Sequence, residues 1–284
     1  MNKADTKTRS RRNRFLLWLT LLTLLVLGLV LSFLAVRQYR SVAWVHAQGG
    51  SVLFEESWPC SQLSASARDW LESKGGLPVI QTIHTVHLDG TQVSDADLVH
   101  LRGMTSLKDL YLQETQVSDS GLVHLKGMTS LEFLFLSESR VSDAGLVHLK
   151  GLSSLEFLYI GGNQVSDAGL VHLEGMTSLK RLSLGGTSVG DAGLAHLKGM
   201  TWLEFLYLNG TQVGDAGLVH VKGLTPLKVL DLNETQVSDA GLVHLKGMTG
   251  LEDLFLNGTR VSESGLSTLR KALPRTAIFP HLEP

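Results

Sequence analysis

Leucine recurs at a fixed interval along most of this chain. The hydrophobic series, with a period of 24 residues, stands at Leu107, Leu131, Leu155, Leu179, Leu203, Leu227 and Leu251, and Ile83 extends it one step back. Each unit opens on alternating positions, as in LEFLFL, where Leu134 and Leu136 fall on one side of a short predicted strand. Because a single unit cannot bury its own leucines, this period predicts a stacked array with one continuous core.

The second half of each unit predicts a short helix. In the stretch SDAGLVH, Ser142 is the predicted N-cap, since its hydroxyl can accept from a free backbone N–H, and Asp143 suits the positive end of the helix dipole. Leu146 and Leu149, three residues apart, form the predicted inward stripe. Gly151 is expected to end the helix as a C-cap.

The same stretch contains serine, aspartate and histidine, the residue types of a nucleophilic triad. Near-copies begin at Ser118, Ser166 and Ser238, and at Gly190 and Gly214 with glycine in place of serine. A triad needs one convergent set, whereas these copies are spread along the array. We therefore expect structural roles for them, no catalytic residues and no enzyme.

Histidines form a column of their own, at His100, His124, His148, His172, His196, His220 and His244. A metal site needs three or four converging ligands, and such a ladder offers at most two per gap between units. A pH-sensitive stripe is the other functional alternative, because histidine titrates near 6.5. We expect a consensus position of the outer helix, with no metal and no other cofactor.

The unit LxxLxLxxTxVSDAGLVHLKGMTS resembles a leucine-rich repeat, and the resemblance covers residues 83 to about 270 in eight units. It implies an α/β solenoid (horseshoe) with parallel strands on the concave face and short helices outside. We place the repeats at 81–270, an N-terminal capping segment at 37–80 and a C-terminal cap at 271–284. Within the caps, strands are expected at 51–54 and 277–279 and helices at 37–48 and 63–74.

The segment before the repeats resembles that of a particular family of leucine-rich-repeat proteins. Gly49 and Gly50, followed by the strand-like SVLF and then by SDAGL repeats, resemble a planctomycete-type family of bacterial membrane proteins with TDAGL-type repeats. Eukaryotic F-box adaptors of ubiquitin ligases have similar repeats. Their F-box helices would have to lie where this chain has an apolar segment and a short cap.

Residues 15–36 are apolar and uncharged, long enough for a helix across a bilayer core of about 30 Å. The segment predicts one transmembrane signal anchor, with a cleaved signal peptide as the competing interpretation. Residues 1–14 carry six Lys or Arg and form a predicted basic cytoplasmic tail. The expectation is a single-pass protein with a cytoplasmic N-terminus and periplasmic or extracellular repeats.

Composition adds little to this picture. The formal net charge of −2 gives no field for nucleic acid, which we do not expect as a partner. Cys60 is the one cysteine, so the chain has no internal disulfide. A half-buried cap residue and an intermolecular bridge both fit it.

The outward strand positions differ most between units, and an array keeps its core positions alike for stability. The candidate partner-binding residues are Tyr111, Phe133, Phe135, Phe157, Tyr159, Arg181, Phe205, Tyr207, Asp231 and Phe255. Exposed aromatic patches often mark protein interfaces, although the rings could also stack on one another across strands. We expect a membrane-tethered scaffold that binds a protein or peptide, with no small-molecule substrate. A cell-envelope spacer without a specific ligand is the alternative.

One further row precedes the strands and alternates imperfectly in sign, with Glu132, Glu156, Glu204 and Glu252 against Lys108, Lys180 and Lys228. It predicts a solvated face with cross-strand charge pairs.

Overall fold

The computed structural model describes residues 22–23, 25–26, 40–55 and 82–279. Most of the predicted anchor, the predicted helix at 63–74 and Cys60 lie outside these residues. Over the residues that are described, none of the helices combines the length and apolar character needed to span a bilayer. The chain divides into two compact units, Val45–Leu53 with Ile83–Pro284 and Met1–Trp44 with Phe54–Thr82, and the first contains all the repeats.

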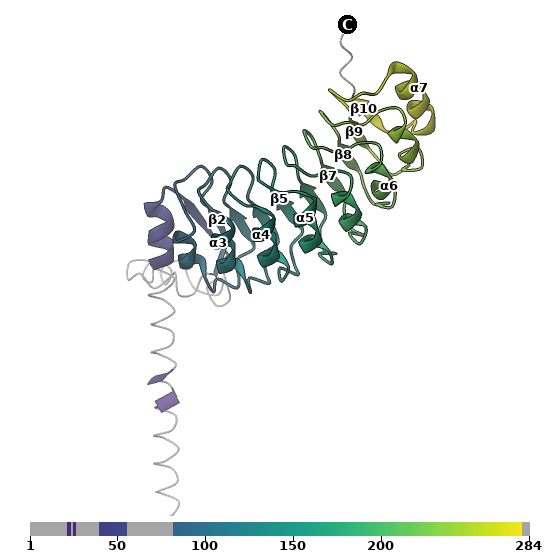
Figure 1. Ribbon diagram of the computed structural model, residues 1–284. Coiled ribbons are helices and arrows are strands. Elements are labelled where there is room, and N and C mark those ends of the chain that lie inside the picture. The colour runs from purple at the N-terminus through teal and green to yellow at the C-terminus, as the bar shows by residue number, and fades with distance from the viewer. Residues whose placement is uncertain (1–21, 24, 27–39, 56–81, 280–284) are drawn as a thin grey trace, which may run out of the picture. The chain divides into compact units, whose positions relative to one another are not determined.

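The strands form one sheet in which sequence order is also spatial order (Figure 1). They are β1 (Ser51–Glu55), β2 (Thr82–His87), β3 (Asp109–Tyr111), β4 (Phe133–Phe135), β5 (Phe157–Tyr159), β6 (Arg181–Ser183), β7 (Phe205–Tyr207), β8 (Val229–Asp231), β9 (Asp253–Phe255) and β10 (Ala277–Phe279). From β2 to β10 each pairs in parallel with the next, in a register of 24 residues, for example Phe133 with Phe157. The predicted parallel sheet and both predicted cap strands are confirmed.

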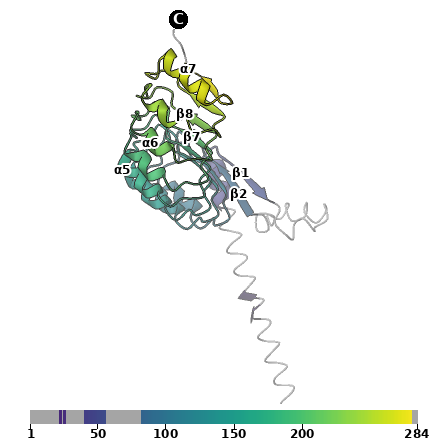
Figure 2. The ribbon, with the colours of Figure 1, turned by 90° about the vertical axis from the view of Figure 1, so that its right-hand side faces the viewer.

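Short helical segments run along the other side of the stack. The α-helices are α3 (Asp119–Leu122), α4 (Asp143–Leu146), α5 (Asp167–Leu170), α6 (Leu218–Val221) and α7 (Glu263–Ala272). The 3₁₀ segments are η3 (Asp97–Leu101), η4 (Val123–Leu125), η5 (Val147–Leu149), η6 (Val171–Leu173), η7 (Gly193–Leu197) and η8 (Gly241–His244). Figure 2 shows α5 and α6 on the side away from β1 and β2.

The core lies between these two sides. Leu134 and Leu136 from the strand side and Leu146 and Leu149 from the helix side are all fully buried, as predicted. Four buried threonines, Thr115, Thr187, Thr211 and Thr235, each donate a hydrogen bond to the backbone carbonyl three residues earlier. Each repeat therefore adds one layer of leucines to the core, two that alternate along the strand and two that are three residues apart on the helical segment.

The predicted C-cap at Gly151 is wrong in its backbone geometry. Gly127 and Gly175, which occupy the same place in neighbouring repeats, adopt φ of 88° and 83°, as a left-handed cap requires, whereas Gly151 is not among the glycines with positive φ. The reason lies one residue earlier. Lys150 stays right-handed with ψ of −23°, while Lys126 opens to ψ of 124° before its glycine.

Candidate functional site

The residues of the SDAGL stretch join successive repeats. The hydroxyl of Ser142 accepts from the N–H of Ala144 at 3.3 Å, which confirms the predicted N-cap. The same hydroxyl donates to Asp119 of the preceding repeat at 2.6 Å, and the backbone N–H of Ser142 donates to the other oxygen of Asp119 at 2.7 Å. Asp143 lies in the first turn of α4, as predicted, but it also accepts the equivalent two bonds from Ser166.

This link repeats along the array. The acceptor and donor pairs are Asp95 with Ser118, Asp119 with Ser142, Asp143 with Ser166, Asp167 with Gly190, Asp191 with Gly214, Asp215 with Ser238 and Asp239 with Ser262. At Gly190 and Gly214 the backbone bond remains at 2.6 Å without a hydroxyl. The serines and aspartates that resemble a triad are therefore hydrogen-bonded to each other across the boundaries between repeats.

The glycine of each SDAGL stretch makes room for the link. A Cβ atom at Gly169 would overlap the carboxylate of Asp143 and come within 3.1 Å of its Cα atom. Gly145 has the same relation to Asp119, and Gly193 to Asp167. An aspartate that reaches into the next repeat can fit only beside a residue without a side chain.

The histidine column lies at the end of the helical segments. His196 bonds Glu174 of the preceding repeat, with 2.6 Å between Nδ1 and Oε1. Glu174 stands where the neighbouring repeats have Lys150 and Lys198, so this pair is particular to one repeat. Within the described ranges, three or more His, Cys, Asp or Glu side chains nowhere gather in a way that could hold a metal ion.

The predicted partner-binding residues lie together on what we call the strand face. It consists of the outward side chains of the sheet in two columns. The first is Thr85, Asp109, Phe133, Phe157, Arg181, Phe205, Val229, Asp253 and Ala277, and the second is His87, Tyr111, Phe135, Tyr159, Ser183, Tyr207, Asp231, Phe255 and Phe279. All ten predicted residues belong to these columns.

Rings of the second column stack continuously at the N-terminal end. His87, Tyr111, Phe135 and Tyr159 follow one another with centroid distances of 4.2, 4.5 and 4.7 Å and interplanar angles of 18° or less. Ring stacking across strands, the alternative explanation of these aromatics, is therefore present. It stabilises the sheet and leaves the outer ring edges half-exposed.

Arg181 interrupts the first column and is held by rings on both sides. Its guanidinium carbon lies 4.9 Å from the ring centroid of Phe157 and 4.1 Å from that of Phe205. Nη1 donates to the hydroxyl of Tyr159 at 3.1 Å. The guanidinium is thus fixed by two cation–π contacts and one hydrogen bond.

Asp231 interrupts the second column between Tyr207 and Phe255. Its carboxylate accepts the backbone N–H of Asn233 at 2.9 Å. Burial raises the pKa of Asp231 above the ordinary value of 3.8. Burial also raises the pKa of Tyr207, and the negative charges of Asp231 and Asp253 add to that effect while Arg181 opposes it.

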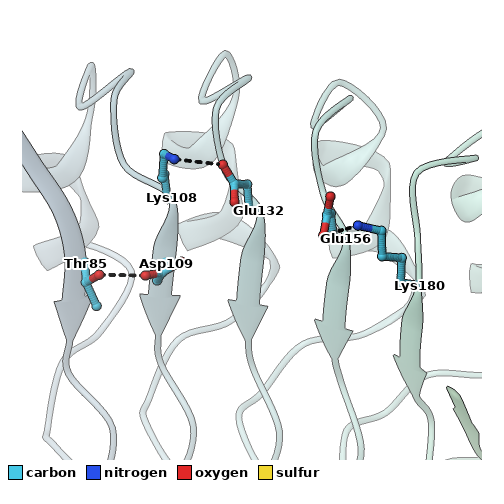
Figure 3. A network of polar contacts seen from close by, with 6 residues as sticks. All are labelled: Thr85, Lys108, Asp109, Glu132, Glu156 and Lys180. Carbon is cyan, nitrogen blue, oxygen red and sulfur yellow. Dashed lines mark hydrogen bonds and ion pairs between the residues drawn. The ribbon is translucent and has the colours of Figure 1, made fainter. Parts of the chain in front are cut away.

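Ion pairs border the strand face, as the alternating row predicts. Lys108 lies 3.2 Å from Glu132, Lys180 lies 2.7 Å from Glu156, and Lys228 lies 2.6 Å from Glu204. Figure 3 shows the first two pairs on neighbouring strands, with Asp109 accepting from the hydroxyl of Thr85 at 2.6 Å. Because these pairs are exposed to solvent that screens their charges, each contributes little to the stability of the fold.

The strand face extends one ring further than the predicted set. Phe279 of β10 stacks on Phe255 with a centroid distance of 4.8 Å. The sequence holds the signal for this contact, because 279 is one period of 24 beyond 255.

Comparison with known proteins supports the leucine-rich repeats. A family model described as leucine-rich repeat matches residues 151–173, 199–220 and 223–245, and the chain carries leucine-rich repeats. Among solved structures it is similar to internalin C2 from Listeria monocytogenes, with 24% identity, 72% of this chain and 83% of that chain covered and a TM-score of 0.58. An internalin (inlF) of the same organism has 22% identity, covers 66% of this chain and 70% of that one and has a TM-score of 0.40. A search of curated protein sequences finds no match.

Proposed function

We propose that this array of leucine-rich repeats is a binding scaffold that holds a protein or peptide partner on its strand face. The observation that carries the proposal is the concentration of half-exposed aromatic and charged side chains on that face, from Tyr111 to Phe255. Large aromatic rings and arginine dominate the binding energy of protein interfaces. The similarity to internalin C2 supports the fold of the scaffold.

The helix side offers a different surface. Its residues repeat almost without change, for example the exposed valines at 123, 147, 171 and 219. A surface that is the same in every repeat can support a stack, but it carries little information with which to distinguish partners. The strand face changes from repeat to repeat, which is what selective recognition of one polypeptide requires.

The location of the scaffold is part of the proposal. The apolar segment 15–36, with six Lys or Arg before it, supports a membrane tether that leaves the repeats outside the cytoplasm. A reporter enzyme that is active only in the cytoplasm, fused to the C-terminus, is expected to be silent. An active fusion would overturn this topology.

Affinity capture with the full-length chain tests the binding role. One variant replaces Phe133, Phe135, Phe157 and Tyr159 with serine. A matched variant replaces four exposed valines with serine on the helix side of the same two repeats and of the two repeats before them, namely Val99, Val123, Val147 and Val171. We expect partners from the native membrane fraction to be lost with the first variant and retained with the second. Circular dichroism establishes that both variants are folded.

Equal recovery of the same proteins by both variants and the unchanged chain would contradict a role for the strand face. That result would favour the spacer, because a structural stack needs no partner on its outward rings.

A further inference from the structure

The strand face already shows how it accommodates a cation. The side chain of Arg181 comes from β6 and fills the interval between rings on β5 and β7, with its guanidinium carbon 4.9 Å from Phe157 and 4.1 Å from Phe205. Two strand steps separate these rings, a spacing of about 9.5 Å. That spacing suits one planar guanidinium with a ring on either side.

The same two-strand interval recurs further along the second column, with a different residue at its centre. Tyr207 on β7 and Phe255 on β9 flank Asp231 on β8 in direct register. Aspartate is too short to fill the interval between the two rings, so it places a carboxylate between the bases of two aromatic side chains. At Arg181 a cation lies between two rings, whereas at Asp231 a carboxylate lies between two rings and leaves space for a cation.

The negative charge of the strand face near β8 and β9 also favours a bound cation. In the described part of the chain, Asp231 and Asp253 have no ion-pair partner, whereas Glu132, Glu156 and Glu204 each pair with a lysine. Burial is the main cause of the raised pKa of Asp231, and the negative charge of Glu234 adds to it. Glu252 directly precedes Asp253 in the sequence. A half-buried carboxylate without a cation is costly, and a bound cation would offset that cost.

We propose that the partner presents an arginine whose guanidinium inserts between Tyr207 and Phe255 and pairs with Asp231. This inference rests on the proposed function, because it names the chemistry of one contact on the same strand face. Arginine fits better than lysine, since a planar guanidinium can stack on both rings while it donates to the carboxylate. Asp253, one strand further in the first column, supplements the negative charge.

Two fluorescent peptides test this contact with the full-length chain in a non-ionic detergent. One alternates arginine with glycine, and its twin replaces each arginine with citrulline, a neutral side chain of nearly the same shape. Fluorescence anisotropy at low salt is expected to give about tenfold weaker binding for the citrulline peptide. Asp231→Asn should weaken binding of the arginine peptide by about tenfold, and Phe255→Leu by about threefold.

Glu263→Gln is the matched control, because Glu263 is an exposed carboxylate in the first turn of α7, outside the strand face. Its binding should stay within about twofold of the unchanged chain. Equal binding of the two peptides, unchanged binding by Asp231→Asn, undetectable binding of the arginine peptide, or equally tight binding of a lysine peptide would each overturn the proposal. If native partners still depend on the strand face in the capture experiment, only this contact has failed and the scaffold role stands.

Discussion

The hydroxyl of Ser166 donates to the carboxylate of Asp143 in the preceding repeat at 2.6 Å, and the backbone N–H of Ser166 donates to the same carboxylate at 2.7 Å. Hydrogen bonds to a charged acceptor are stronger than those between neutral groups. The stack is therefore held by a polar link at each repeat boundary as well as by its leucines. Residue types that could suggest catalysis serve here to fix one repeat on the next.

Gly190→Ser is expected to stabilise the protein by about 1 kcal/mol. Its Cβ atom would lie 3.6 Å from the nearest oxygen of Asp167, an ordinary contact that lets the new hydroxyl reach the carboxylate. Gly151→Ser is the control, because a Cβ atom there meets nothing within 4 Å. Urea unfolding should show a larger gain for Gly190→Ser. Equal gains would mean that the hydroxyl link contributes nothing.

Gly169→Ala is expected to destabilise the fold by about 1–3 kcal/mol, because the added methyl group would overlap the Asp143 carboxylate. Asp143→Ala removes the obstacle as well as two hydrogen bonds. The double variant should therefore be more stable than the sum of the two single effects predicts. Strict additivity in urea unfolding would contradict this contact between repeats.

Phe135→Leu is expected to cost about 1–3 kcal/mol in unfolding free energy beyond its loss of area, since Phe135 stacks on both Tyr111 and Tyr159. Phe133→Leu loses a single edge contact, with Phe157, and should cost about half as much. The comparison keeps the strand and the type of substitution constant. Equal losses would mean that the continuous stack adds nothing to stability.

Asp239 should contribute stability that depends on pH. The hydroxyl of Ser262, with its backbone N–H, lowers the pKa of Asp239 below the ordinary 3.8. A lowered folded pKa contributes stability that is fully present above the unfolded pKa and is lost as pH falls through the folded value. Asp239→Asn should therefore be less stable than the unchanged chain at neutral pH and nearly equal to it in strong acid, by urea unfolding. A constant difference across this range would contradict the link.

The effect of Asp231 on stability should depend on pH in the opposite sense to that of Asp239. Burial raises its folded pKa, so its ionisation costs stability, and the cost appears as pH rises through the folded pKa. Asp231→Asn is expected to be more stable than the unchanged chain at neutral pH, with the advantage vanishing below the unfolded pKa of about 3.8. A loss of stability at neutral pH would show that Asp231 serves the fold. A gain of stability in Asp231→Asn is expected if Asp231 serves binding at the expense of the fold.

The period of 24 was enough to predict the sheet and the core. Leu134 and Leu136 follow strand alternation and Leu146 and Leu149 follow helical spacing, so their burial depends only on local geometry. The cap at Gly151 was wrong because the ψ of a single preceding residue, Lys150, decides whether the glycine turns left-handed. Sequence preference alone does not fix that angle.

The sequence predicted that the ten candidate residues share one face of the sheet, but it did not predict the contacts among them. Strand alternation placed the outward residues, yet the second role of Asp143 depends on a residue 23 positions later that only the stacked array brings near. In the same way, the sequence named Arg181 and Asp231 only as candidate partner-binding residues. Their opposite relations to the flanking rings follow from side-chain length and strand spacing together.

Site-specific photocrosslinking tests the binding role of the strand face most directly. A benzophenone side chain is introduced at Tyr207 on the strand face, or at Val219 on the helix side, where the native side chain is 49% exposed. Irradiation of the full-length chain in its native membranes should give one discrete polypeptide adduct from position 207 and none from position 219. Adducts from position 219 alone, or none from position 207, would contradict a partner on the strand face.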